Sequence, residues 1–73
     1  MTPKRAYSAG WAASGRPTAD LDRAEARFAR THGLDASDPL MDDWLDGWMD
    51  VAVGRPKWAL YRHRHEGAPD PTI

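Results

Sequence analysis

The 73-residue chain contains no cysteine, which excludes disulfide bonds and thiolate zinc sites. It also has no apolar run long enough to cross a membrane, and only one phenylalanine. Neither sign of charge dominates, because ten lysines and arginines balance eleven acids to a net charge of −1. Because cysteine and membrane-spanning runs are both lacking, we expect a cytoplasmic protein. A chain this short buries only about 60% of its unfolded surface, so its core needs unusually close packing or a partner.

The charges are segregated along the chain although they nearly cancel. Residues 1–16 carry three bases and no acid, whereas residues 35–50 carry six aspartates and no base. Residues 55–65 are basic again. This segregation favours mutual neutralisation inside the fold, and a basic docking patch is the alternative.

Apolar spacing and capping residues predict an all-α protein. Helices are expected over residues 4–14, 19–32 (with Thr18 as N-cap) and 39–53, and the pattern also allows a short helix over 57–65. We expect a helical hairpin of the first and third helices with the second covering its side. These elements would form one domain over residues 1–66, followed by a flexible C-terminal tail, 67–73.

Two glycines lie in the middle of predicted helices, where glycine costs about 1 kcal/mol relative to alanine. They are Gly10, before Trp11, and Gly47, before Trp48. Small residues let two helices approach closely, so we predict that helices 4–14 and 39–53 cross at these glycines. The aromatic residues would then form the core around the crossing, or alternatively a platform for stacking a ligand. The predicted core residues are Tyr7, Gly10, Trp11, Phe28, Trp44, Gly47 and Trp48.

The same two stretches resemble motifs of a known family. YSAGWA at residues 7–12 and WLDGWMDVA at residues 44–52 are similar to the paired Tyr-x-Ala-Gly-x-Ala and Trp-Leu-x-Gly-Trp-x-x-Ala motifs of the ribosome modulation factor family. The resemblance implies a small helical protein that binds bacterial ribosomes near the mRNA exit region and favours inactive, dimeric particles. This chain departs from the family in its slightly acidic charge and in the longer stretch between the motifs.

Basic and aromatic residues near the helix ends form a candidate nucleic-acid site. If helices 4–14 and 39–53 pack antiparallel, these residues assemble one basic pole. The planar guanidinium group of arginine suits phosphate, and Trp58 or Tyr61 could stack on an unpaired base. The alternative is that the charges serve only solubility. The candidates are Lys4, Arg5, Arg16, Arg55, Lys57, Trp58, Arg62 and Arg64.

Catalytic and metal chemistry find no support in the sequence. No nucleophile is paired with a nearby base, so we expect no enzyme and no small-molecule substrate. His63 and His65 would diverge on a helix and lack further ligands, so we expect neither metal nor cofactor.

The sequence therefore predicts a noncatalytic, ribosome-associated factor that contacts rRNA phosphates and modulates translation by occupancy, with no membrane partner. The alternative is a protein-interaction module, either an inhibitor of a host protein encoded by a mobile element or a homodimer that uses the aromatic stripe. In that case the acidic face formed by Asp42, Asp46 and Asp50 would attract a basic partner.

Overall fold

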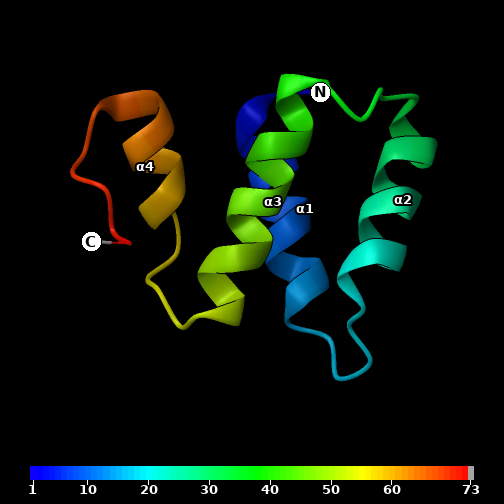
Figure 1. The fold of residues 1–73 in the computed structure, drawn as a ribbon, viewed down its shortest axis with the longest axis horizontal. Helices are drawn as coiled ribbons and strands as arrows, with labels where there is room; N and C mark the ends of the chain where they lie inside the picture. Colours follow the sequence, from blue (N-terminus) through cyan, green and yellow to red (C-terminus); the bar gives the residue numbers. More distant parts are fainter. Residues whose placement is uncertain (73) are drawn as a thin grey trace.

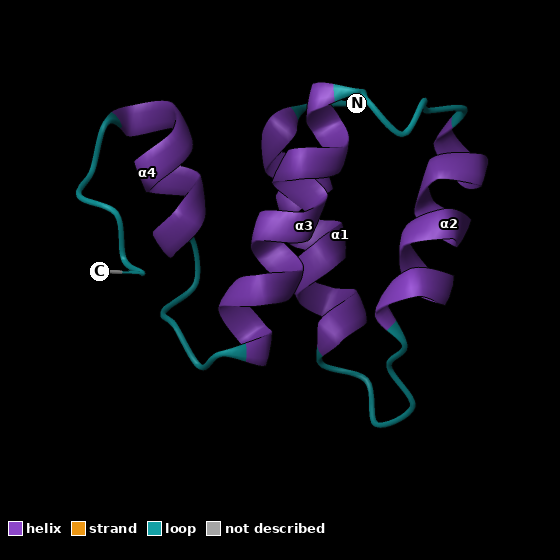
Figure 2. Ribbon diagram, viewed as in Figure 1, coloured by secondary structure: helices purple, strands orange, loops and turns teal. Residues whose placement is uncertain are grey.

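The computed structural model describes residues 1–72, and over this range the chain forms four α-helices and no strand (Figure 2). The helices are α1 (Pro3–Ser14), α2 (Leu21–His32), α3 (Pro39–Ala52) and α4 (Ala59–Glu66). The all-α prediction is confirmed, and each expected boundary lies within two residues of the observed one. None of the helices within residues 1–72 has the length and apolar character needed to cross a bilayer.

Side-chain caps fix the start of the first three helices. Thr2 accepts a hydrogen bond from the backbone N–H of Arg5 at 3.2 Å, and Asp38 accepts one from Leu40 at 2.9 Å. At α2 the cap is Asp20, which accepts from the N–H of Arg23 at 3.1 Å. The prediction that Thr18 caps this helix is wrong, because an aspartate closer to the apolar row takes the role; α2 therefore begins two residues later than expected.

α1 and α3 run in the same direction and cross, with α4 beside them and α2 on the other side (Figure 1). The contacts of α4 agree with this arrangement. Along α3, Asp50 bonds the start of α4 at Leu60 and Asp43 bonds its end at His65, so these two helices are antiparallel. Along α1, Tyr7 bonds the backbone of Trp58, while Lys4 lies beside the last turns of α4, so this pair is antiparallel too.

The antiparallel hairpin that we considered for α1 and α3 is therefore wrong. The reason is topological. α2 contains 12 residues, as α1 does, and returns the chain to the end where α1 began. With short connections, α3 must then start beside the N-terminus of α1 and run parallel to it.

The predicted glycine crossing is confirmed. A Cβ atom at Gly10 would collide with the carbonyl oxygen of Trp44, and a Cβ atom at Gly47 would collide with that of Tyr7. Both glycines are buried. The helices thus touch backbone to backbone, which explains why each tolerates a residue of low helix propensity at its centre.

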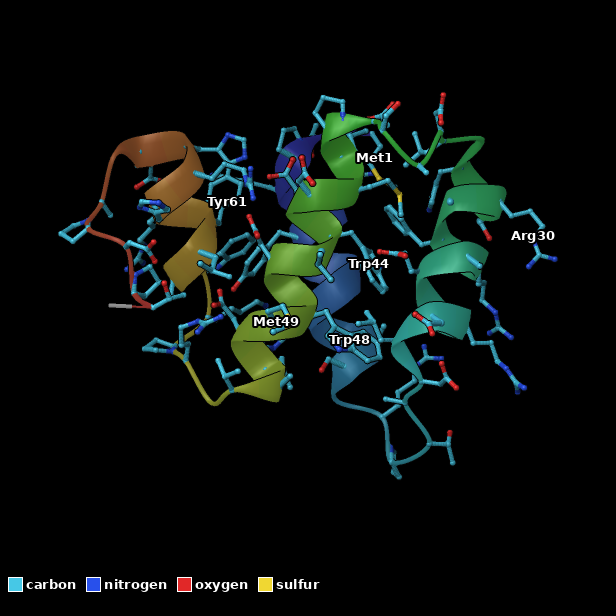
Figure 3. All side chains as sticks on the ribbon, in the orientation of Figure 1. Met1, Arg30, Trp44, Trp48, Met49 and Tyr61 are labelled. Atoms are coloured by element: carbon cyan, nitrogen blue, oxygen red, sulfur yellow. The ribbon has the colours of Figure 1, made fainter. Side chains whose placement is uncertain are left out.

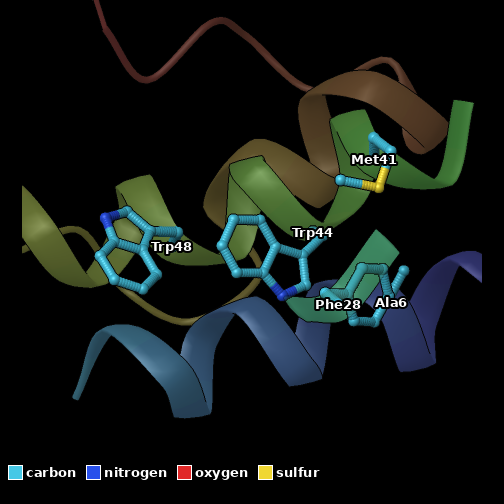
Figure 4. Close-up of a cluster of buried hydrophobic side chains, with 5 residues drawn as sticks. All are labelled: Ala6, Phe28, Met41, Trp44 and Trp48. Carbon is cyan, nitrogen blue, oxygen red and sulfur yellow. The ribbon is translucent and has the colours of Figure 1, made fainter. Parts of the chain in front are cut away.

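Aromatic side chains divide into two clusters, one on each side of the crossing. On the α2 side, the ring of Trp44 stacks between those of Phe28 and Trp48, with centroids 5.8 and 5.5 Å away (Figure 4). On the α4 side, Tyr7 stacks on Trp58 at 4.5 Å and on Trp11 at 6.3 Å. Trp11 is only half-buried, whereas the other predicted core residues lie in the interior.

Residues 67–72 turn back along α4 (Figure 1). The N–H of Ala68 donates to the carbonyl of Arg62 at 3.2 Å, and the Nδ1 atom of His63 lies 2.7 Å from the carbonyl oxygen of Ala68. Gly67 adopts a φ of 70°, which closes the helix and reverses the chain. Residues 67–72 thus contact α4, the flexibility of this tail stays a prediction, and residue 73 lies outside the described residues.

Candidate nucleic-acid interface

Asp50 is the centre of a buried polar network that joins α1, α3 and α4. Its carboxylate is fully buried and accepts hydrogen bonds from the hydroxyl of Tyr7 at 2.5 Å and the N–H of Leu60 at 3.0 Å. The other carboxylate oxygen accepts from Nε of Arg55 at 2.8 Å. Both oxygens are thus satisfied, which is the condition under which a buried charge is tolerated.

Tyr7 connects this network to α4. Its hydroxyl donates to Asp50 and accepts from the backbone N–H of Trp58 at 2.6 Å. Burial raises the pKa of Tyr7 far above its ordinary value, and the hydrogen bond to the Asp50 carboxylate raises it further. The phenol therefore stays protonated and keeps donating across the neutral range.

Two further aspartates of α3 pair with the end of α4. The guanidinium of Arg64 donates to both oxygens of Asp46, at 2.6 and 3.2 Å, and His65 lies 2.5 Å from Asp43. The hydrogen bond to Asp46 raises the pKa of Arg64. Asp43 and Asp46 are buried in this contact.

The predicted acidic partner face is therefore wrong at two of its three positions. Asp46 and Asp50 face α4 together with Asp43, at the i, i+3, i+7 spacing of one helix face, and only Asp42 is exposed. The expectation that acidic and basic segments neutralise each other inside the fold is confirmed at two pairs, Asp50 with Arg55 and Asp46 with Arg64.

The predicted cations are not gathered at one pole, because α1 and α3 are parallel. Arg55 and Arg64 are paired with Asp50 and Asp46; Arg55 is mostly covered, whereas the Arg64 side chain remains 44% exposed, and phosphate binding by either stays a prediction. The remaining five are exposed and make no ion pair within residues 1–72: Lys4, Arg5, Arg16, Lys57 and Arg62. Arg16 follows the C-terminal end of α1, far from Lys4 at its start.

Basic and aromatic side chains meet where α4 lies against α1. A cleft of about 290 Å³ is lined there by Lys4, Trp58, Tyr61, Arg62 and one acid, Glu66. Beside it, Nζ of Lys57 lies 5.4 Å from the ring centroid of Trp58. Figure 3 shows Tyr61 extending from α4 toward α1 and α3. We call this surface, formed by Lys4, Lys57, Trp58, Tyr61 and Arg62, the α1/α4 face.

Trp58 has an unusual backbone conformation for a large residue. Its φ is 77°, and it is the one non-glycine residue within 1–72 with a positive φ. Such a conformation costs on the order of 1–3 kcal/mol and persists only where neighbours impose it. Here the hydrogen bond from its N–H to Tyr7 and the stacking of its ring on Tyr7 hold it. No short-range sequence signal indicates this conformation, because Tyr7 is 51 positions away.

The two histidines of α4 have different neighbours. His65 faces Asp43, whereas His63 faces the carbonyl of Ala68 and lies 4.0 Å from Asp70. Over residues 1–72 no group of three histidines, cysteines or acids is arranged to hold a metal ion.

Comparison with known proteins returned no match to a family model, to a curated protein or to a solved structure. The resemblance of residues 7–12 and 44–52 to the ribosome modulation factor family stays a prediction. The features of the molecule that bear on its function are the α1/α4 face and the unpaired charges on it.

Proposed function

We propose that this chain is a noncatalytic protein that binds RNA, in particular ribosomal RNA, through the α1/α4 face. The observation that supports the proposal is the cleft in which Lys4 and Arg62 lie beside the rings of Trp58 and Tyr61. Cationic groups next to accessible aromatic rings are the combination that binds unpaired nucleotides, with phosphates meeting the cations and bases stacking on the rings.

The net charge of −1 alone does not indicate RNA binding. The distribution of paired and unpaired charges over the fold does favour it. Three aspartates of α3 are buried: Asp50 and Asp46 are paired with Arg55 and Arg64, and Asp43 contacts His65. The acidic helix therefore contributes little repulsion at the surface. Lys4, Lys57 and Arg62 have no such partner within residues 1–72, so they are available to phosphate.

The rigidity of the α1/α4 face also favours binding. Trp58 is fixed by Tyr7, which is itself fixed by Asp50, so the indole ring loses little conformational freedom when a base stacks on it. A left-handed tryptophan is a strained feature, and strain of this kind is concentrated at functional sites.

The ribosome as the target follows from the resemblance to the ribosome modulation factor family. Its paired motifs in this chain are the residues around Gly10 and Gly47, which set the α1/α3 crossing. The mechanism would be occupancy: the protein covers an RNA surface that mRNA or another factor needs, and no bond is made or broken.

Sedimentation of ribosomes with the purified protein tests the target, at about 50 mM and about 200 mM salt. We expect co-pelleting that weakens with salt. Failure to co-pellet at both salt concentrations would overturn ribosome binding.

Anisotropy titrations with labelled single-stranded rRNA segments test the face. The double variant Lys4→Gln, Arg62→Gln should weaken binding and lower the salt slope by about one for each lost phosphate contact. Arg30→Gln, on the exposed part of α2, is the matched control, and Glu66→Gln should strengthen binding by removing the one acid of the cleft. Equal losses in the double variant and in the control would contradict the α1/α4 face.

The homodimer through the aromatic stripe loses its support, because Trp44 and Trp48 are at least 93% buried within one chain, with exposures of 1% and 7%. A protein-interaction role is favoured by a different surface, the groove between α1 and α2.

A further inference from the structure

A groove of about 560 Å³ lies between the C-terminal half of α1 and α2. Phe28 is the one buried residue of α2 and stacks on Trp44, while Leu21, Ala24 and Ala29 of α2 pack partly buried against the core. Small side chains account for the open space. The alanines that line the groove are Ala9, Ala12, Ala13, Ala19 and Ala24.

The charges around this groove have one dominant sign. Arg16, Arg23 and Arg27 line it, and none of them makes an ion pair within residues 1–72. Asp20 is the one acid of the lining, and its Oδ1 atom already accepts the N–H of Arg23 as the cap of α2. An occupant would therefore meet an apolar floor between three unpaired guanidinium groups.

We propose that this α1/α2 groove binds an acidic amphipathic helix of a partner protein. Alanines allow the backbone of an incoming helix to approach, as glycines do at the α1/α3 crossing, whereas Phe28 and Trp44 are buried beneath them. The three arginines can form bidentate hydrogen bonds with carboxylates on the flanks of that helix.

The chain itself does not supply such a helix to a second copy. Its most acidic helix, α3, has its apolar stripe and three aspartates buried between α1, α2 and α4. Within residues 1–72 the exposed large hydrophobic residues are Met1 and Val53, and neither belongs to an acidic helical face. A separate protein is therefore the occupant that fits.

This second site is independent of the α1/α4 face. α2 and α4 lie on opposite sides of the α1/α3 pair (Figure 1), so a helix bound beside α2 leaves the cleft beside α4 uncovered. One protein could then bridge RNA and a protein partner.

A selection from a displayed library of helical peptides tests the proposal. The peptides share apolar residues at i, i+3, i+4 and i+7, and their other positions vary among glutamate, glutamine and lysine. We expect enrichment of glutamate on both flanks of the apolar face. Absence of enrichment, or enrichment of lysine, would overturn the proposal.

Variants then locate the selected peptide, which is labelled and followed by anisotropy. Arg23→Glu with Arg27→Glu should weaken binding at least about tenfold, because attraction becomes repulsion at the rim. Arg30→Glu is the matched control on the same helix, outside the groove, and should change affinity by less than about twofold. Equal losses in both proteins would overturn the groove as the site, as would amide shift changes on peptide binding confined to α4. Circular dichroism confirms that the variants are folded.

Discussion

The two sides of the α1/α3 pair differ in the interactions that attach α4 and α2 to it. On the α4 side, buried aspartates receive hydrogen bonds from Tyr7, Arg55 and Arg64, and a short helix with little helix-forming signal is fixed in place. On the α2 side, a strongly amphipathic helix is attached mainly through Phe28, and its arginines are left unpaired.

This difference shows that the charge of a sequence is a poor guide to the charge of its surface. Of the lysines and arginines in residues 55–65, Arg55 and Arg64 are paired with aspartates of α3, whereas Lys57 and Arg62 are exposed. Residues 18–34 carry three acids and three arginines, but α2 leaves Arg23 and Arg27 beside an open groove. The closely packed α4 side should therefore determine stability, and the loosely packed α2 side should be able to separate from it.

Gly47→Leu should lower the stability of the fold more than any of the other substitutions. The new side chain would meet the carbonyl of Tyr7 and the N–H of Trp11, which are backbone atoms and cannot move aside. We expect a loss of roughly 5 kcal/mol, enough to unfold a domain of this size. Circular dichroism and urea titration measure it.

Gly15→Ala is the control for that variant. Gly15 has a φ of −76°, and a Cβ atom there would have its nearest neighbour at 3.7 Å. We expect no loss, or a gain of about 0.4–1 kcal/mol. Equal stability of the Gly47→Leu protein and the parent would contradict the backbone contact at the crossing.

Asp50→Ala should have the next largest effect. The substitution leaves the Tyr7 hydroxyl, the Leu60 N–H and the guanidinium of Arg55 without their acceptor. We expect a loss of about 3–4 kcal/mol, because removal of one partner strands a buried charge. Asp42→Ala is the control, because Asp42 is exposed although it is adjacent to the buried Asp43 in the sequence. It should change stability by less than about 0.5 kcal/mol. If the two aspartates proved equivalent in thermal melts, the network would not hold α4.

Phe28→Ala should break the α2 side alone. We expect a loss of about 2 kcal/mol, less than is usual for a buried phenylalanine, because α2 can detach without opening the α1/α3 crossing. Hydrogen exchange should show the amides of α2 losing protection while those of α1 and α3 keep it. Phe28→Leu, which retains most of the apolar contact, should preserve the protection of α2. Simultaneous loss across all four helices would mean that the two sides form one cooperative unit.

The fold was predictable from local signals, and its arrangement was not. The helices follow from apolar spacing and caps, and the crossing follows from two glycines placed before tryptophans. The parallel direction of α1 and α3 was implied by the length of the predicted second helix, but the predicted crossing at the two glycines is compatible with either direction.

The partners of charged residues were the harder part of the site to predict. Asp50 joins Tyr7, 43 positions away, to Arg55, and no helical period indicates this contact. Arg16 of the α1/α2 groove was predicted as a nucleic-acid-binding residue, whereas Arg23 and Arg27 were missed as site residues because α2 has the ordinary pattern of an amphipathic surface helix. The sequence did contain a signal for a basic helix face. Arg23 and Arg27 are four positions apart and therefore lie on one face of the helix, and Ala24 lies near them.

Alkaline pH should weaken the α4 side by a smaller, graded amount. The pKa of Tyr7 is raised in the folded protein above the ordinary value of 10.0, so the folded state keeps a proton that the unfolded chain loses. Stability from this group is complete below pH 10 and should fall as pH rises, at about 1.4 kcal/mol per pH unit.

The Tyr61→Phe variant leaves Tyr7 as the single tyrosine, so tyrosinate absorbance reports on it alone. We expect that absorbance to rise only together with the loss of helical circular dichroism. A rise near pH 10 with the helices intact would show that the Tyr7 hydroxyl reaches solvent in the folded state, and that the network around Asp50 does not hold its proton.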